Sequence, residues 1–287
     1  MSAAPPADGS DETADETAEE PDDETADEAS GPSRSATAPR RPRLPRPPGK
    51  LWGLVSRPSW RELRLRREGQ DLEANPIWRG EGVPEGHGRR LVLVPGFLAG
   101  PRSLSRLEPW LRRCGWDTHR APVGRNNGPG ELVVDELEAW VEQTVAMEGA
   151  PVPVIGHSRG GQEARVLAVR RPELFSLLIT LGAPFRVLYP PHIGVRAPAA
   201  YLQLRHRFRG LRHDPEAHRR YQEDRVGPFP PDLPFVSVYS RTDGFMDWRF
   251  CLDDAADHVE VDCTHLGLAT SVPAFQAIAD ALRRLDP

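Results

Sequence analysis

The residues best suited to chemistry lie near the middle of this chain, where an apolar run ends in a glycine-flanked serine. Residues 152–155 (Val-Pro-Val-Ile) lead into Gly-His-Ser-Arg-Gly-Gly at 156–161, and a helix-forming stretch follows. A sharp strand-to-helix turn with the pattern Gly-x-Ser-x-Gly strains its central residue and exposes that residue's side chain. The pattern therefore predicts Ser158 as a nucleophile.

A serine hydroxyl is a poor nucleophile near neutral pH and needs a base, which in turn needs an orienting acid. Asp243 comes just after an expected strand at 235–239 and is followed by Gly244, and Asp247 is the alternative acid. His265 comes just after an expected strand at 258–261 and before the last expected helix. The chain order of Ser158, Asp243 and His265 is the order in which one large class of hydrolytic sites presents nucleophile, acid and base.

The other histidines are weaker candidates for the base. His157 adjoins the serine, but its side chain is expected to project away from the site. His206, His213 and His218 fall in an insertion, and the pair at 213 and 218 lacks the further ligands of a zinc site. We therefore expect neither a metal nor a cofactor.

A tetrahedral intermediate also needs hydrogen-bond donors for its oxyanion. In this type of site the donors are the backbone N–H after the nucleophile and one from the loop after an earlier strand. Here these are Arg159 and, in the loop Val-Pro-Gly-Phe-Leu-Ala-Gly at 94–100, Phe97. An ordinary strand-to-helix turn is the alternative interpretation of that loop.

The elements that must position these residues alternate along the chain, which predicts an α/β fold with a mostly parallel sheet flanked by helices. Residues 185–233 interrupt the alternation and predict a small helical cap, with a surface helix pair as the alternative. The expected strands cover 91–94, 116–121, 152–155, 175–181, 235–239 and 258–261, and the expected helices cover 103–114, 131–147, 158–169 and 272–285.

Charge and composition divide the chain into three parts. Residues 1–32 hold twelve acidic residues and no basic one, and a stretch rich in proline and arginine follows, so residues 1–50 are predicted to be a disordered tail. Residues 51–88 are predicted to form a helical lead-in, and residues 89–287 are predicted to form the α/β domain. Peripheral contact of the basic, tryptophan-bearing segment 51–66 with a membrane surface is an alternative to simple packing.

Several classes of protein are disfavoured by composition. The chain shows no secretory signal and no apolar run of spanning length, which predicts a cytoplasmic protein. Three cysteines do not make a disulfide framework, although Cys251 and Cys263, which lie between the acid and histidine positions, could be neighbours and their pairing is left open. The basic stretch has the acidic tail as a competing partner, so no nucleic acid is expected. The oligomeric state is left open.

Five motifs in this order resemble the α/β-hydrolase superfamily, and most closely its lipase/esterase branch from high-GC bacteria. They are Val-Pro-Gly-Phe at 94–97, Gly-His-Ser-Arg-Gly-Gly at 156–161, Thr-Leu-Gly-Ala-Pro at 180–184, Tyr-Ser-Arg-Thr-Asp-Gly at 239–244 and Thr-His-Leu-Gly-Leu at 264–268. The resemblance covers about residues 89–285. One departure is Pro95-Gly96, where many relatives carry His-Gly.

The resemblance implies a triad of Ser158, Asp243 and His265, with Phe97 and Arg159 forming the oxyanion hole. It also implies a serine hydrolase that cleaves small-molecule or lipid carboxylic esters through an acyl-enzyme. The alternatives are an acyltransferase or thioesterase with the same triad, and a non-catalytic binding or scaffold protein, because fold alone does not determine function.

Overall fold

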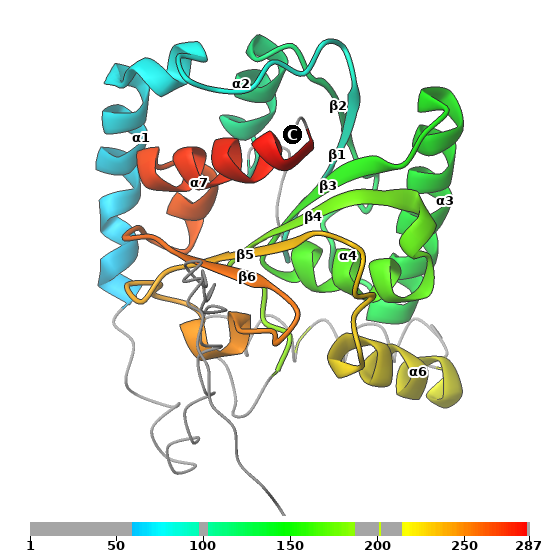
Figure 1. Cartoon of the computed structure of the whole chain (residues 1–287). Helices are drawn as coiled ribbons and strands as arrows, with labels where there is room; N and C mark the ends of the chain where they lie inside the picture. The colour runs from blue at the N-terminus through cyan, green and yellow to red at the C-terminus, as the bar shows by residue number, and fades with distance from the viewer. Residues whose placement is uncertain (1–58, 98–102, 187–200, 202–213, 286–287) are drawn as a thin grey trace, which may run out of the picture. The chain divides into compact units, whose positions relative to one another are not determined.

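The computed structural model describes residues 59–97, 103–186, 201 and 214–285 (Figure 1). Strands and helices alternate through most of this range. The strands are β1 Arg90–Val94, β2 Asp117–Arg120, β3 Val152–His157, β4 Phe175–Leu181, β5 Phe235–Tyr239 and β6 Asp257–Glu260. The α-helices are α1 Leu65–Ala74, α2 Leu107–Arg113, α3 Gly130–Glu148, α4 Arg159–Arg170, α6 Pro215–Val226 and α7 Val272–Leu282. Short 3₁₀ helices are η2 Ser59–Arg64, η3 Pro76–Arg79, η4 Pro172–Leu174, η5 Trp248–Cys251, η6 Leu266–Ala269 and η7 Arg283–Leu285.

The six strands form one sheet in the order β2-β1-β3-β4-β5-β6, and every neighbouring pair is parallel. The chain moves outward to β2 after β1 and then returns to place β3 on the other side of β1. In open parallel sheets, such a reversal of direction opens a crevice at the carboxyl ends of the two central strands. The loops after β1 and β3 therefore meet at one edge of the sheet.

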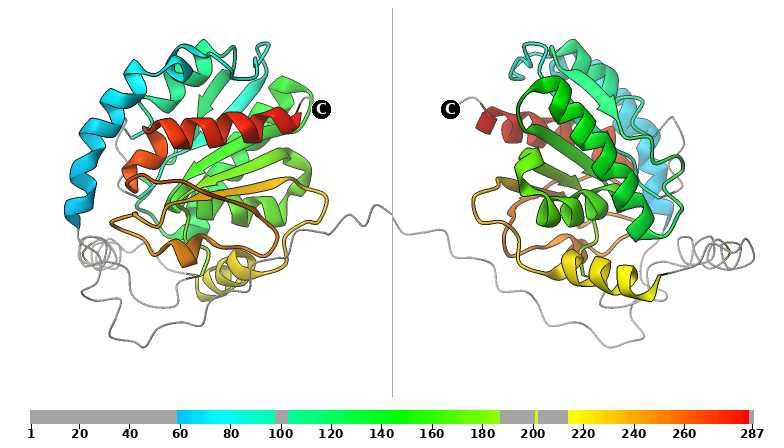
Figure 2. Two further views of the ribbon diagram at one scale, coloured as in Figure 1. Left: turned by 60° about the vertical axis from the view of Figure 1, so that its left-hand side comes forward. Right: turned by 90° about the vertical axis from the view of Figure 1, so that its right-hand side faces the viewer.

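Helices cover both faces of the sheet, as the two views in Figure 2 show. On one face, α1, α2 and α7 pack against side chains such as Leu93, Ile155 and Ile179. On the other face, α3 and α4 pack against side chains such as Val92 and Val154, and α6 lies against α4. Because both faces are buried, the inner strands β1, β3, β4 and β5 consist of nearly continuous apolar runs, whereas the edge strands β2 and β6 are more polar.

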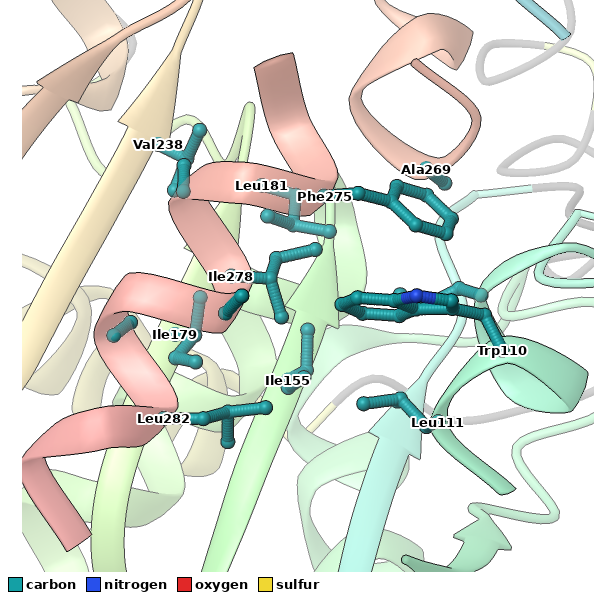
Figure 3. Close-up of a cluster of buried hydrophobic side chains, with 14 of the residues drawn as sticks. Trp110, Leu111, Ile155, Ile179, Leu181, Val238, Ala269, Phe275, Ile278 and Leu282 are labelled. Carbon is teal, nitrogen blue, oxygen red and sulfur yellow. The ribbon is translucent and has the colours of Figure 1, made fainter. Parts of the chain in front are cut away.

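The core on the α7 side is organised around two aromatic rings (Figure 3). Trp110 from α2 and Phe275 from α7 lie with ring centroids 4.4 Å apart, and both side chains are fully buried. The buried indole N–H is satisfied, because Trp110 Nε1 donates to the carbonyl of Ile77 at 2.7 Å. That bond ties η3 to α2 and helps to hold the lead-in segment on the α/β domain.

The expected α/β fold class is confirmed, and every predicted strand and helix of the alternating core is present, with ends shifted by a few residues. The largest shift is in α2, which begins at Leu107 and not at residue 103, because residues 103–106 form a turn. The tail at 1–50 and most of the cap at 185–233 lie outside the described residues, so these domain boundaries stay predictions. Among the described residues, no helix combines the length and apolar composition needed to cross a membrane.

Candidate active site

Ser158 occupies a strained turn between β3 and α4. Its backbone has φ 53° and ψ −124°, a conformation that costs a non-glycine residue about 1–3 kcal/mol. Hydrogen bonds on both sides hold it there: Ser158 N donates to the carbonyl of Leu181 at 2.8 Å, and Ser158 O accepts from Gly161 N at 3.0 Å. The strain is thus stabilised by the sheet before the turn and the helix after it.

Two glycines make this crossing of strand and helix sterically feasible. A Cβ on Gly156 would lie 2.4 Å from Gly161 Cα, and one on Gly160 would lie 2.4 Å from the carbonyl oxygen of Val94. Both obstacles are backbone atoms, which a rotamer change cannot move. The glycines flanking Ser158 in the sequence pattern are therefore required by the close approach of α4 to β3 and β1.

We expect Gly156→Ala to lower the free energy of unfolding by about 3 kcal/mol, because overpacking against fixed backbone is costly. Gly128→Ala is the matched control, since its Cβ would meet only Val133 Cγ2 at an ordinary 3.5 Å. Urea titration followed by circular dichroism measures both. Equal stability of the two variants would contradict the close crossing.

Ser158, His265 and Asp243 form a continuous hydrogen-bonded relay across the carboxyl edge of the sheet. Ser158 Oγ lies 3.0 Å from His265 Nε2, and His265 Nδ1 lies 2.6 Å from Asp243 Oδ2. A carboxylate only accepts hydrogen bonds, so the imidazole carries its proton on Nδ1 and Nε2 is left to accept from the serine hydroxyl. The three residues follow β3, β5 and β6, and parallel strands bring their carboxyl ends to a common edge.

Asp243 is itself held in place by the turn that follows it. Its Oδ1 accepts from Phe245 N at 2.7 Å and from Met246 N at 2.6 Å, which leaves Oδ2 for the imidazole. The alternative acid, Asp247, caps the next short helix: its Oδ1 accepts from Arg249 N at 3.0 Å, and its carboxylate pairs with the Arg249 guanidinium. Of the two candidate acids, only Asp243 has a hydrogen bond to His265 among the described residues.

Charges around the imidazole favour its protonated form. Burial, the largest single effect, lowers the pKa of His265, but the charge and hydrogen bond of Asp243 and the charge of Glu62 together outweigh it and raise that pKa above its ordinary value. His157 behaves in the opposite way, because burial and the neighbouring His265 lower its pKa to about 4. The pKa of His265 thus lies above its ordinary value, whereas His157 stays neutral at neutral pH.

The predicted pH profile follows from this electrostatic environment. His265 must be neutral to accept the serine proton, so kcat/KM should fall as pH drops through its raised pKa, with a midpoint above about 6.5. The measurement is kcat/KM on a soluble ester from pH 5 to 9. Burial also raises the pKa of Glu163 to about 7, so the same profile for Glu163→Gln serves as the control. Loss of the acidic limb in that variant would assign the limb to Glu163 and not to His265.

The expectation that the His157 side chain projects away from the site is wrong. Its ring centroid lies 5.0 Å from that of His265, and His157 Nε2 donates to the carbonyl of His265 at 3.0 Å. The local turn pattern does not specify this contact, which depends on a loop more than a hundred residues away in the chain. His157 thus holds the backbone of the base through the carbonyl of His265.

The two proposed oxyanion donors lie on neighbouring segments. A Cβ on Gly96 would come within 3.1 Å of Ser158 Cβ, so the loop after β1 passes directly beside the nucleophile. Arg159 is the first residue of α4, where backbone N–H groups have no acceptor within the helix. The Arg159 guanidinium lies 5.8 Å from the centroid of the Phe97 ring. Residues 98–102 of the loop lie outside the described residues.

A buried polar network supports this loop and was not foreseen from the sequence. Asn126 Nδ2 donates to the carbonyl of Pro95 at 2.9 Å and to Glu163 Oε2 at 2.6 Å, and Arg159 Nε donates to Glu163 Oε1 at 2.8 Å. Asn126 adopts φ 47°, which asparagine tolerates better than most residues. The sequence Asn-Asn-Gly at 126–128 was the available signal, since it is typical of a tight turn.

Other predicted features can now be placed. Cys114, Cys251 and Cys263 are all buried free thiols, so the pairing of Cys251 with Cys263 that the sequence left open is not formed. His218 lies beside Glu131 at 3.4 Å, whereas His206 and His213 are outside the described residues. Within the described ranges, no group of three or more His, Cys, Asp or Glu side chains could hold a metal ion.

Comparison with known proteins agrees with this architecture. No family model matches the chain. Triacylglycerol lipases from Pseudarthrobacter phenanthrenivorans and Burkholderia plantarii are each 43% identical to it over 61 residues, which is 21% of this chain and 18% and 16% of theirs. The match therefore spans less than a fifth of the length of these curated relatives.

Solved structures are similar over a longer range. An α/β-hydrolase enzyme from the metagenome of lagoon sediments at Mar Chica, Morocco, has a TM-score of 0.50 and 16% identity, covering 71% of this chain and 94% of that one. Est1E from Butyrivibrio proteoclasticus covers 71% of this chain and 90% of its own, with a TM-score of 0.46 and 16% identity. Together with the parallel six-stranded sheet flanked by helices, the likeness to the Mar Chica enzyme shows the fold. The chain has the α/β-hydrolase fold.

Proposed function

We propose that this protein is a serine hydrolase that cleaves carboxylic esters through an acyl-enzyme on Ser158. The observation that carries the proposal is the relay from Ser158 Oγ to His265 Nε2 at 3.0 Å and from His265 Nδ1 to Asp243 Oδ2 at 2.6 Å. Nucleophile, base and orienting acid with this mutual geometry define acyl-transfer sites on several unrelated folds.

Acylation begins when His265 Nε2 accepts the hydroxyl proton as Ser158 Oγ attacks the ester carbonyl. The negative charge that develops on the carbonyl oxygen is stabilised by the backbone N–H groups of Arg159 and Phe97. The imidazolium then gives its proton to the leaving alcohol, and Asp243 stabilises the positive charge in between. A water molecule activated by the same imidazole attacks the acyl-enzyme and regenerates the serine.

The chemical class of the substrate is proposed from similarity. Two curated relatives that share a short segment with this chain are named triacylglycerol lipases, which favours esters of fatty acids. Residues 187–200 and 202–213, part of the predicted cap, lie outside the described residues, so the acyl-chain preference must be measured directly. A series of p-nitrophenyl esters of increasing chain length gives that preference.

Labelling by a fluorophosphonate probe is the experiment that tests the proposal. The wild-type protein should be labelled at Ser158 and should release free acid from p-nitrophenyl esters. Release of free acid, against transfer of the acyl group to an added alcohol or thiol, separates a hydrolase from an acyltransferase. Absence of labelling together with absence of ester cleavage across the series would favour a binding protein and refute the proposal.

A further inference from the structure

The start of the described chain, far from the catalytic residues in sequence, contacts both loops that carry them. Glu62 in η2 accepts hydrogen bonds at Oε1 from Gly244 N at 3.0 Å and from His265 N at 2.9 Å. Its Oε2 accepts from Leu266 N at 3.3 Å. One side chain thus joins the residue after Asp243 to the backbone of His265 itself.

A second carboxylate from the same segment holds the histidine loop one residue earlier. Glu68 in α1 is buried and accepts from Thr264 N at 2.9 Å and from Thr264 Oγ1 at 2.6 Å. At the rim, Arg64 pairs with Asp262 at 3.3 Å. These contacts fix η2 and α1 against the loop that carries His265. The position of the Glu62 carboxylate therefore does not depend only on the hydrogen bonds that Glu62 itself accepts.

The glycines opposite these carboxylates indicate how closely the segment fits. A Cβ on Gly244 would lie 2.9 Å from Glu62 Oε1, and one on Gly267 would lie 2.2 Å from Glu68 Oε2. Gly244 and Gly267 are parts of the acid and histidine motifs, and neither needs a positive φ. Their lack of a side chain is therefore explained by the approach of the two glutamates.

We propose that Glu62 is a positioning residue that sets the geometry of the Asp243–His265 pair by bridging the backbones of their two loops. This inference rests on the proposed function. The β5 and β6 strands end at Tyr239 and Glu260, several residues before the acid and the base, so sheet hydrogen bonds alone do not hold these two side chains in register. Ser240 and Thr242 already link the two loops at Cys263. Glu62 adds a cross-link nearer to the acid and the base, at Gly244 N and His265 N, and His157 Nε2 donates to the carbonyl of His265.

The charge of Glu62 also acts on the imidazole. The charged groups that face His265 are Asp243 and Glu62, and the adjacent His157 is neutral at working pH. Both carboxylates favour the imidazolium, which must form when the serine proton is transferred. Because Glu62 is only half-buried, water screens its charge and its effect on the pKa is smaller than that of Asp243.

Two substitutions at Glu62 distinguish its effect on the position of the two loops from the effect of its charge on the imidazole. Glu62→Gln keeps an oxygen that can accept from Gly244 N and His265 N but removes the charge. Its plateau kcat should stay within about threefold of wild type, and the acidic limb of kcat/KM should move to lower pH. Glu62→Ala removes every acceptor, so kcat should fall about 10- to 100-fold with KM little changed, the cost of a misplaced catalytic group.

The matched controls lie on the same segment. Glu68→Gln should lower the melting temperature but leave the acidic limb in place, because Glu68 binds Thr264 and not the imidazole. Glu73→Gln, which loses only an exposed pair with Arg106, should behave as wild type. If Glu62 contributed only to stability, Glu62→Gln would behave like Glu68→Gln, with a lower melting temperature and an unchanged acidic limb.

A readout without substrate separates this inference from the proposed function. The proton NMR titration of His265, identified by its loss in His265→Gln, should show a lower pKa in Glu62→Gln than in wild type, whether or not esters are cleaved. An unchanged titration in Glu62→Gln together with an unchanged kcat in Glu62→Ala would overturn the proposal. Inactivity of wild type towards all esters with a shifted titration would refute the proposed function and leave the placement of Glu62 intact.

Discussion

Ser158→Ala is expected to abolish ester hydrolysis while leaving the fold unchanged. The variant lacks the attacking oxygen, so kcat should fall by at least about a thousandfold, the scale seen when a triad nucleophile is removed. Stability should change little, because alanine keeps the Cβ and the backbone strain at φ 53° and loses only the bond to His265. The measurements are kcat on a p-nitrophenyl ester, fluorophosphonate labelling and the melting temperature.

Ser158→Gly is the matched control for backbone strain. Glycine adopts positive φ readily, so this variant should be as inactive as Ser158→Ala but more stable by about 1 kcal/mol. Residual activity near wild type in either variant would rule out Ser158 as the nucleophile. Equal melting temperatures of the two variants would show that the turn stores little strain.

Asp243→Asn should lower kcat by about 10⁴-fold, the loss expected when the orienting acid is neutralised. The local hydrogen bonds explain why. Oδ1 of residue 243 accepts from Phe245 N and Met246 N, so an asparagine must keep its oxygen there and turn its amide NH₂ toward His265. The imidazole Nδ1 then has to accept, its proton moves to Nε2, and Nε2 can no longer take the serine proton.

Asp247→Asn is the comparison that makes this test decisive. Asparagine can still accept from Arg249 N, so the variant should keep kcat within about threefold of wild type. If Asp247→Asn lost its activity and Asp243→Asn remained active, Asp247 and not Asp243 would be the orienting acid. Rates compared on the alkaline plateau of each protein's own pH profile exclude a simple shift of the imidazole pKa.

Much of the fold could be predicted from the sequence, because strands, helices and turns are specified by the residues within each segment. Continuous short apolar runs, such as residues 91–94, are typical of strands buried on both faces, and their alternation with amphipathic helices predicts a parallel sheet. Glycines at fixed offsets from Ser158 mark a strand-to-helix turn. Since parallel strands end at one edge, residues that directly follow strands are brought together, and the candidate triad could be chosen from strand ends alone.

The choice between Asp243 and Asp247 needed the tertiary structure. Both carboxylates follow β5 closely, and the sequence favoured Asp243 only by its distance from the strand. The direction of each side chain depends on which backbone N–H groups it accepts: those of Phe245 and Met246 turn Asp243 toward the imidazole, and that of Arg249 turns Asp247 away. Such local turns are not specified by residue type and strand boundaries.

The distant partners of polar residues could not be predicted from the sequence. Glu62 meets Gly244 and His265 across 182 and 203 residues, and Asn126 meets Pro95 and Glu163 across 31 and 37 residues. A single glutamate in a basic helical segment has the same local pattern whether it faces water or a catalytic loop. Periodicity and turn chemistry thus determined the sheet, the strand-to-helix turn at Ser158 and the candidate triad. The partners of isolated polar side chains were decided only by the tertiary structure, because a hydrogen bond between distant segments leaves no local pattern that names its partner.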